Sequence, residues 1–145
     1  MRVVLDSNVL LSALISPHGT SNVIYRVWRA AKFDLVTSVI QLDELRRASR
    51  YPKFKKILQP MRVGTMINNL QHAIILQQLT VKIEADDPND SFLLSMSIEG
   101  KADYLVTGDH RAGLLKRKKI ESTRIVTPAT FCFDVLRYSQ TRVDS

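Results

Sequence analysis

The feature that most constrains this chain is a short apolar run that ends in a carboxylate. Residues 3–5 (Val-Val-Leu) form the run, and Asp6 follows directly. An unbroken apolar run of this kind is typical of a strand buried on both faces, as in a parallel sheet covered by helices. Residues 7–14 then predict a helix, because N-cap residue types come first and apolar residues follow at helical spacing. We therefore predict a strand, a carboxylate and a helix in immediate succession.

The predicted position of Asp6 has two interpretations. In open α/β sheets, ligands bind beyond the carboxyl ends of the strands, and Asp6 would lie at that edge. The alternative is purely structural, with Asp6 serving only as the N-cap of the helix that follows. The rest of the chain has to decide between them.

Length and composition favour one domain with one core. The chain has 145 residues, of which 45% are hydrophobic. The single cysteine, Cys132, excludes an internal disulfide and a multi-cysteine zinc site. No apolar run reaches membrane-spanning length, and no secretory leader precedes Asp6. We expect a cytoplasmic protein that does not associate with membranes.

The pattern of apolar runs and turn residues predicts an α/β fold. Helix signals alternate with the strand signals, which favours a parallel sheet of about five strands with helices on both faces. We place this single domain at residues 1–138 and expect residues 139–145 to be a frayed tail. Beyond the first strand, the strand signals lie at residues 35–36, 80–83, 102–109 and 124–126.

Four carboxylates fall at strand ends and helix starts. Asp6 and Asp109 end predicted strands, whereas Glu44 and Asp90 lie near the starts of predicted helices. An acid in the first turns of a helix is usually a dipole or capping partner. If all four lie on one edge of the sheet, however, they repel one another and need a cation. Oxygen-only ligands suit Mg²⁺ or Mn²⁺.

At these positions the chain resembles a known family, the PIN-domain nucleases. It is most similar to the small prokaryotic VapC-like toxin components of toxin–antitoxin systems. The resemblance extends from about Arg2 to Leu136, in the order of the family's motifs. The motifs that carry it are Leu5–Leu10, Glu44–Leu45, Asp87–Asp90 and Ala102–Asp109, the last with its Thr-Gly-Asp turn.

The resemblance implies a PIN-like domain that acts as a metal-dependent endoribonuclease with Mg²⁺ or Mn²⁺ as its cofactor. It further implies RNA as substrate, a possible cognate antitoxin protein and a homodimer. Asp87 is better interpreted as a turn or capping residue than as a ligand. The residues that match the acidic metal-binding positions are Asp6, Glu44, Asp90 and Asp109, with Asn8 and Thr107 as supporting polar residues.

The net charge of +7 and the sequence pI of about 9.8 make a polyanionic partner plausible, although a basic balance also serves solubility. Two basic clusters could hold an RNA backbone, which would make binding strongly salt-dependent. The alternative for each cluster is a solvated face. The candidate residues are Arg46, Arg47, Arg50, Lys116, Arg117, Lys118 and Lys119.

Two other functions compete with the nuclease. The first is a non-catalytic PIN-like module that binds RNA or a protein partner. Loss of one of the four acids would favour it, and all four are present. The second is a magnesium-dependent phosphatase, whose motif needs a second Asp two residues after the first. Asn8 stands there instead.

Overall fold

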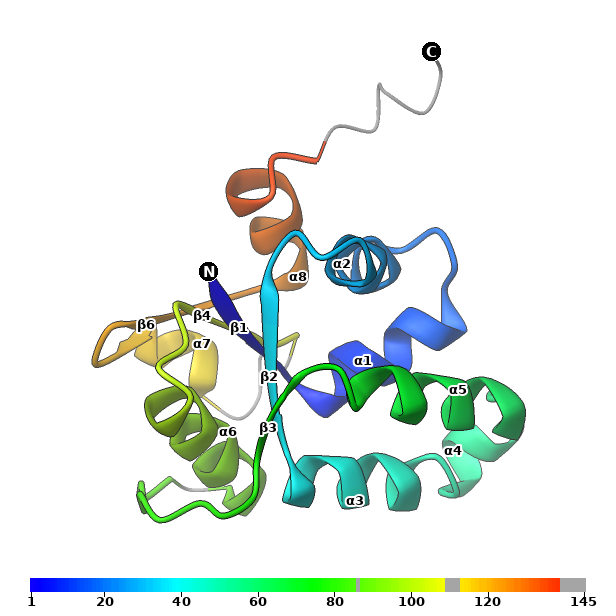
Figure 1. Ribbon diagram of the computed structural model, residues 1–145, viewed down its shortest axis with the longest axis horizontal. Coiled ribbons are helices and arrows are strands. Elements are labelled where there is room, and N and C mark those ends of the chain that lie inside the picture. Colours follow the sequence, from blue (N-terminus) through cyan, green and yellow to red (C-terminus); the bar gives the residue numbers. More distant parts are fainter. Residues whose placement is uncertain (86, 109–112, 139–145) are drawn as a thin grey trace.

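A mostly parallel sheet runs through the centre of the protein (Figure 1). The computed structural model describes residues 1–85, 87–108 and 113–138. In these residues the sheet has six strands in the order β3-β2-β1-β4-β6-β5, and only β5 is antiparallel to its neighbour. The strands are β1 (Arg2–Leu5), β2 (Asp34–Ser38), β3 (Ile74–Leu76), β4 (Tyr104–Val106), β5 (Lys119–Ile120) and β6 (Thr123–Val126).

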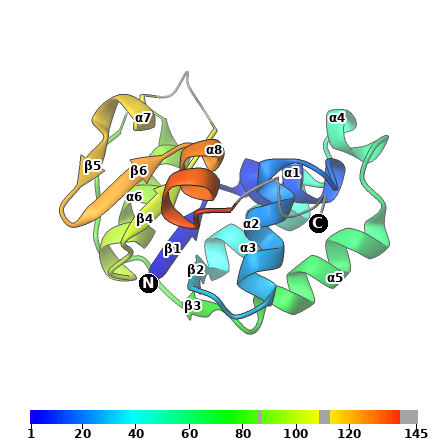
Figure 2. The ribbon, with the colours of Figure 1, turned by 90° about the horizontal axis from the view of Figure 1, so that it is seen from above.

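Helices cover both faces of the sheet, as the alternating pattern predicted. Figure 2 shows α6 and α7 on the opposite side of the sheet from α1, α2 and α5. Over the same part of the chain, the helices are α1 (Ser7–Ile15), α2 (Thr20–Arg29), α3 (Val39–Ala48), α4 (Pro52–Lys55), α5 (Pro60–Leu70), α6 (Pro88–Glu99), α7 (Leu114–Arg117) and α8 (Pro128–Thr130), followed by the π-helical turn η1 (Phe131–Val135).

The first strand contributes to two cores because its side chains alternate between faces. Val3 and Leu5 pack into the larger core with α1, α2, α3, α5 and η1. Val4 faces the smaller core with α6 and α7. All three side chains are buried, which confirms the prediction of a strand covered on both sides.

Side-chain caps begin the helices that lead away from the carboxyl edge of the sheet. Asp6 caps α1, and Ser38 caps α3. Asp87 caps α6, as its position in the acidic turn predicted, and Pro88 is the first residue of that helix. Each cap satisfies a backbone N–H that has no partner within its own helix.

The edge strand beyond β2 is not where the pattern predicted it. Residues 80–83 do not form a strand; Ile74–Leu76 does, in parallel register with β2. Helix α5 ends at Leu70, which leaves Ile74–Leu76 free to pair with β2. Pairing with β2 decides the matter, because it satisfies backbone groups that a short apolar segment cannot satisfy alone.

No helix in the part of the chain that the structure describes is both long enough and apolar enough to cross a bilayer. The predicted tail at residues 139–145 lies outside the described residues.

Candidate active site

Asp6 lies at the carboxyl end of β1, where parallel pairing with β4 brings it beside Thr107. The Thr107 hydroxyl donates to Asp6 Oδ2 at 2.8 Å, and the Asn8 backbone N–H donates to Oδ1 at 3.1 Å. The Asp6 side chain is 8% exposed, and Thr107 is fully buried. Asp6 is therefore both a helix cap and a carboxylate held in a fixed orientation, so the two interpretations of its role do not exclude each other.

Glu44 reaches the same edge from α3. The Ser7 hydroxyl donates to Glu44 Oε2 at 3.0 Å. Burial raises the pKa of Glu44 above its ordinary value of 4.5, and the nearby charges of Asp6 and Asp87 raise it further. The Ser7 hydrogen bond and the charge of Arg47 oppose this pKa shift without cancelling it. The Glu44 carboxylate therefore lies within electrostatic range of Asp6 and Asp87, which cap two other helices.

A buried hydrogen-bond network around Gln41 holds Ser7 in place, and no sequence motif indicated this network. The Gln41 side-chain amide donates to the carbonyl of Leu5 at 2.7 Å and lies 3.4 Å from Ser7 Oγ. Its oxygen accepts a 2.7 Å bond from the hydroxyl of Thr37. Because the amide N–H points at Ser7 Oγ, the Ser7 proton is left to bond Glu44. Gln41 is one turn before Glu44 on α3, a spacing that could have indicated a shared face.

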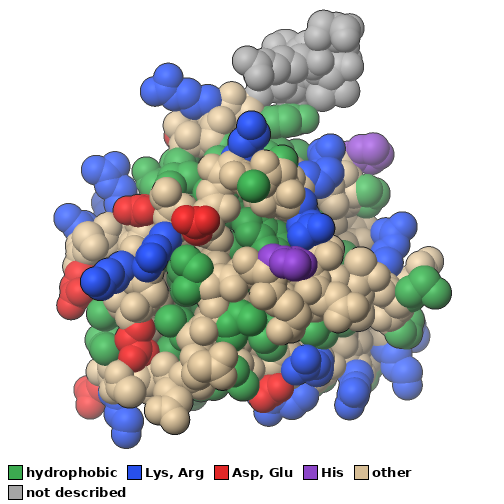
Figure 3. All heavy atoms as spheres, viewed as in Figure 1, with side chains coloured by type: hydrophobic (Ala, Val, Ile, Leu, Met, Phe, Trp, Pro, Cys, Tyr) green, Lys and Arg blue, Asp and Glu red, His purple; other side chains and the backbone are tan. Residues whose placement is uncertain are grey.

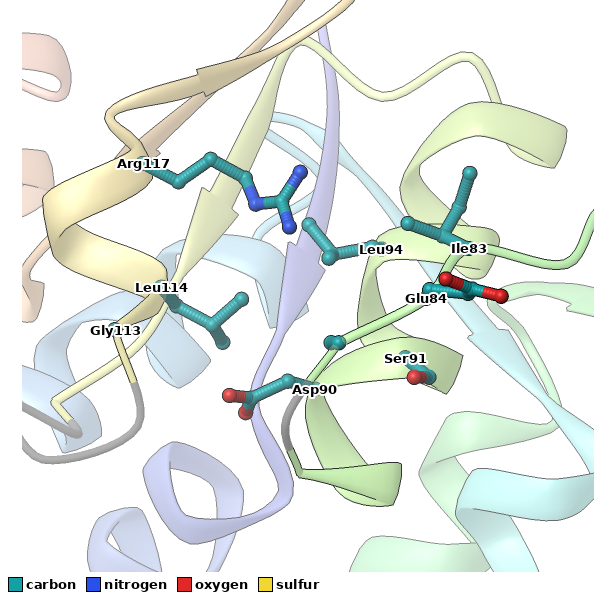
Figure 4. A pocket seen from close by; sticks show the side chains of 9 residues that line it. Ile83, Glu84, Asp90, Ser91, Leu94, Gly113, Leu114 and Arg117 are labelled. Carbon is teal, nitrogen blue, oxygen red and sulfur yellow. The ribbon is translucent and has the colours of Figure 1, made fainter.

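The acidic turn supplies a third carboxylate from the first turn of α6. Asp90 is 4% exposed, and its backbone N–H bonds to the carbonyl of the capping residue Asp87. Asp90 lines a cavity of about 690 Å³, which we call the α7 cavity (Figure 4). Its other lining residues include Glu84, Ser91, Leu94, Leu114 and Arg117.

Two sequence-predicted site residues remain, Asn8 and Asp109. Asn8 is exposed and lines a second cavity. Gly108, the residue after Thr107, lines the same cavity. Asp109 lies outside the described residues.

Of the basic residues predicted to bind RNA, some lie near the acids and others line a separate cavity. Arg117 extends its guanidinium into the α7 cavity (Figure 4). Arg47 is close enough to Glu44 to affect its pKa. Arg46 pairs with Asp43 at 3.1 Å, and with Arg50 it lines a separate cavity beside α5. Lys116, Lys118 and Lys119 are exposed, as is Arg117.

The acids fit a divalent cation by their chemistry rather than as a preformed cage. Within residues 1–85, 87–108 and 113–138, no group of three or more His, Cys, Asp or Glu side chains is placed to hold a metal. The donors at the edge are carboxylate oxygens, the ligands that Mg²⁺ and Mn²⁺ prefer. Neighbouring carboxylates also raise the pKa of Glu44, and a cation between them would relieve that repulsion.

Together these features define an α/β domain with acidic residues gathered at the carboxyl edge of a parallel sheet. The family model for the PIN domain matches residues 2–111, and the chain therefore belongs to the PIN-domain family. PIN domains are generally nucleases and generally use divalent metal ions.

Comparison with solved structures gives the same fold. A chain in the crystal structure of VapBC2 from Rickettsia felis, bound to a DNA fragment from their promoter, superimposes with a TM-score of 0.56. The two are 20% identical, over 88% of this chain and 98% of that one. No curated protein matches the sequence.

Proposed function

We propose that this protein is a metal-dependent endoribonuclease that hydrolyses RNA phosphodiester bonds. The observation that carries the proposal is the pair of oriented carboxylates at the carboxyl edge of the sheet. Asp6 is held by Thr107, and Glu44 is held by Ser7. The family match to a class that generally comprises nucleases supports it.

The candidate ligands are Asp6, Glu44, Asp90 and Asp109. When bound, Mg²⁺ or Mn²⁺ would activate water for attack on phosphorus and neutralise charge on the phosphodiester. The chain's own part is orientation, since Thr107 and Ser7 each direct a carboxylate oxygen. Arg117 would contribute a cation for the phosphate backbone in the adjoining cavity.

We further propose that the protein is the toxin of a toxin–antitoxin pair, with a cognate antitoxin as its partner, and that it forms a homodimer. The fold shared with a chain of the VapBC2 complex supports the first part. Lys and Arg side chains are spread over the face shown in Figure 3, in keeping with the net charge of +7 and a polyanionic substrate.

The alternative function is a PIN-like module that binds RNA or a protein partner without cleaving RNA. Cleavage by the purified protein separates the two functions.

The decisive experiment is incubation with a pool of single-stranded RNA in Mn²⁺, in Mg²⁺ and in chelator, followed by mapping of the new ends. We expect metal-dependent internal cuts that Asp6→Asn abolishes, because that change removes a charged ligand. Asp134→Asn, at an exposed aspartate on η1, is the matched control. Cleavage by Asp6→Asn at the wild-type rate would exclude this metal site, and RNA binding without cleavage would favour the module.

A further inference from the structure

Two cavities open beside the acidic edge. One is the α7 cavity. The second, of about 440 Å³, we call the α4 cavity. Its lining residues include Asn8, Ser12, Ser21, Lys53, Gly108 and Pro128. Each volume is in the range of a small-molecule site.

The two cavities lie on opposite faces of the sheet. The α4 cavity is lined from α1, α2 and α4, whose apolar side chains pack in the larger core. The α7 cavity is lined from α6 and α7, which pack in the smaller core. Asp6 follows β1, whose side chains pack in both cores, so it lies at the sheet edge between the two faces. On one side its partner Thr107 precedes Gly108 of the α4 cavity.

Each cavity pairs one cation with surfaces suited to a nucleotide. Lys53 belongs to the α4 cavity, where the hydroxyls of Ser12 and Ser21 offer hydrogen bonds. In the α7 cavity, Arg117 extends inward beside the apolar side chain of Leu94 (Figure 4). An apolar surface can contact the face of a base, while a guanidinium contacts phosphate.

We propose that these cavities bind the nucleotides on either side of the scissile phosphate of a single-stranded RNA. Lys53 contacts the phosphate backbone on one side, and Arg117 contacts it on the other. The chain of the RNA crosses the sheet edge at Asp6, which makes the enzyme require substrate on both sides of the cut. This inference rests on the proposed ribonuclease function and assigns a role to Lys53, which the sequence pattern had not singled out.

Single-stranded RNA is the substrate class that this geometry favours. Two separate cavities can each accept one unstacked nucleotide, whereas the bases of a duplex remain stacked and paired. Proteins that recognise duplex RNA instead read its shape across successive minor grooves.

The binding test compares Lys53→Ala and Arg117→Ala with two matched controls. Lys56→Ala changes an exposed lysine just after α4, and Arg124→Ala changes an exposed arginine on β6 that lines a different cavity, with Met1 and Asp103. Binding of a labelled single-stranded RNA is measured in chelator, across a salt series, so that cleavage does not interfere. We expect weaker binding for the two test variants and a salt slope lower by about 0.7 for each lost phosphate contact, with both controls unchanged.

The cleavage test uses RNAs shortened on one side of a mapped cut at a time. We expect Lys53→Ala to slow cleavage of the full-length RNA but not of an RNA shortened on one side, because the nucleotide that Lys53 contacts is then absent. Arg117→Ala should lose its effect on cleavage only when the RNA is shortened on the opposite side. The inference would be overturned if Lys53→Ala and Arg117→Ala behaved like their controls. It would also be overturned if both variants lost their effect with the same truncation, or if the wild type bound duplex RNA as tightly as single-stranded RNA. Wild-type protein that binds RNA with these dependences but never cuts it would refute the nuclease function and leave the two binding sites standing.

Discussion

At the scale of single residues, the acidic edge is held together by short neutral side chains. Thr107 directs Asp6, and Ser7 directs Glu44. Behind them, Gln41 is 1% exposed and connects Leu5 on β1 with Thr37 on β2. A buried amide with these partners is costly to replace, because each group it leaves without a partner costs about 1–3 kcal/mol. These hydrogen bonds fix the orientation of both carboxylates from the protein side.

The raised pKa of Glu44 predicts how stability depends on pH. The folded state keeps the proton at pH values where the unfolded chain, with a pKa near 4.5, has lost it. Protonated Glu44 therefore contributes favourably to the free energy of unfolding. This contribution is complete below the unfolded pKa and is lost as pH rises through the folded pKa. Above that range, ionised Glu44 destabilises the metal-free fold.

We expect Glu44→Gln to be more stable than wild type at pH 7 in chelator, with an advantage that shrinks to nothing below about pH 4. The amide oxygen of the introduced glutamine could still accept the Ser7 hydrogen bond. Urea unfolding from pH 4 to 8 measures the difference, with Glu121→Gln as the control at an exposed glutamate. A variant less stable than wild type at pH 7 would contradict the sign.

At the scale of elements, the approach of α6 to β2 determines where the acidic turn lies. Gly100, at the carboxyl end of α6, is so close to β2 that an added Cβ would be 2.6 Å from a methyl carbon of Val36. The same Cβ would lie 2.8 Å from the carbonyl oxygen of Met96. Helix α6 can therefore pack at this distance only with glycine at that position, and its other end carries Asp87 and Asp90.

We expect Gly100→Ala to destabilise the fold by about 1–3 kcal/mol, because the helix and strand must move apart. The matched control is Gly64→Ala in α5, where an added Cβ meets nothing within 4 Å. There the change should stabilise by about 0.5–1 kcal/mol, since alanine suits a helix interior better than glycine. Urea midpoints of the two variants should move in opposite directions, and a shared direction would contradict the packing argument.

At the scale of the whole molecule, one edge of the sheet collects negative charge on a protein that is otherwise basic. The sheet edge carries Asp6, Glu44 and Asp87 of the acidic turn, while the net charge of the chain is +7. A polyanion attracted to the basic surface would still be repelled at this acidic edge. A divalent cation that binds only the folded state would remove this conflict and stabilise the domain.

We expect Mn²⁺ at one hundred times its dissociation constant to stabilise the wild type by about 2.7 kcal/mol. For a domain of this size that corresponds to roughly 5–10 °C in melting temperature. Melting curves in Mn²⁺ and in chelator give the shift. Asp6→Asn should show a smaller shift and Asp134→Asn the full one; equal shifts in all three proteins would mean that Asp6 is not a ligand.

The local features of this protein were readable from the sequence because they depend on near neighbours. The apolar run before Asp6 predicted a buried strand, and Asp87 was interpreted as a turn or capping residue, which is the role it has at the start of α6. The alternation of strand and helix signals predicted the parallel sheet, and the five parallel strands agree with it. The order of the acids led to the family, which the match over residues 2–111 confirms. The roles of those acids as ligands stay predictions.

Only the tertiary structure decided which side chains meet across the sheet. It moved the edge strand to Ile74–Leu76, because register with β2 outweighs the local alternation at residues 80–83. The fold places the Gln41 side chain against the carbonyl of Leu5, 36 positions away. It also places Arg46 and Arg117 at different cavities, and only the cavity of Arg117 contains Asp90. Such contacts depend on strand order and on the distance at which helices pack, and no window of neighbouring residues contains that information.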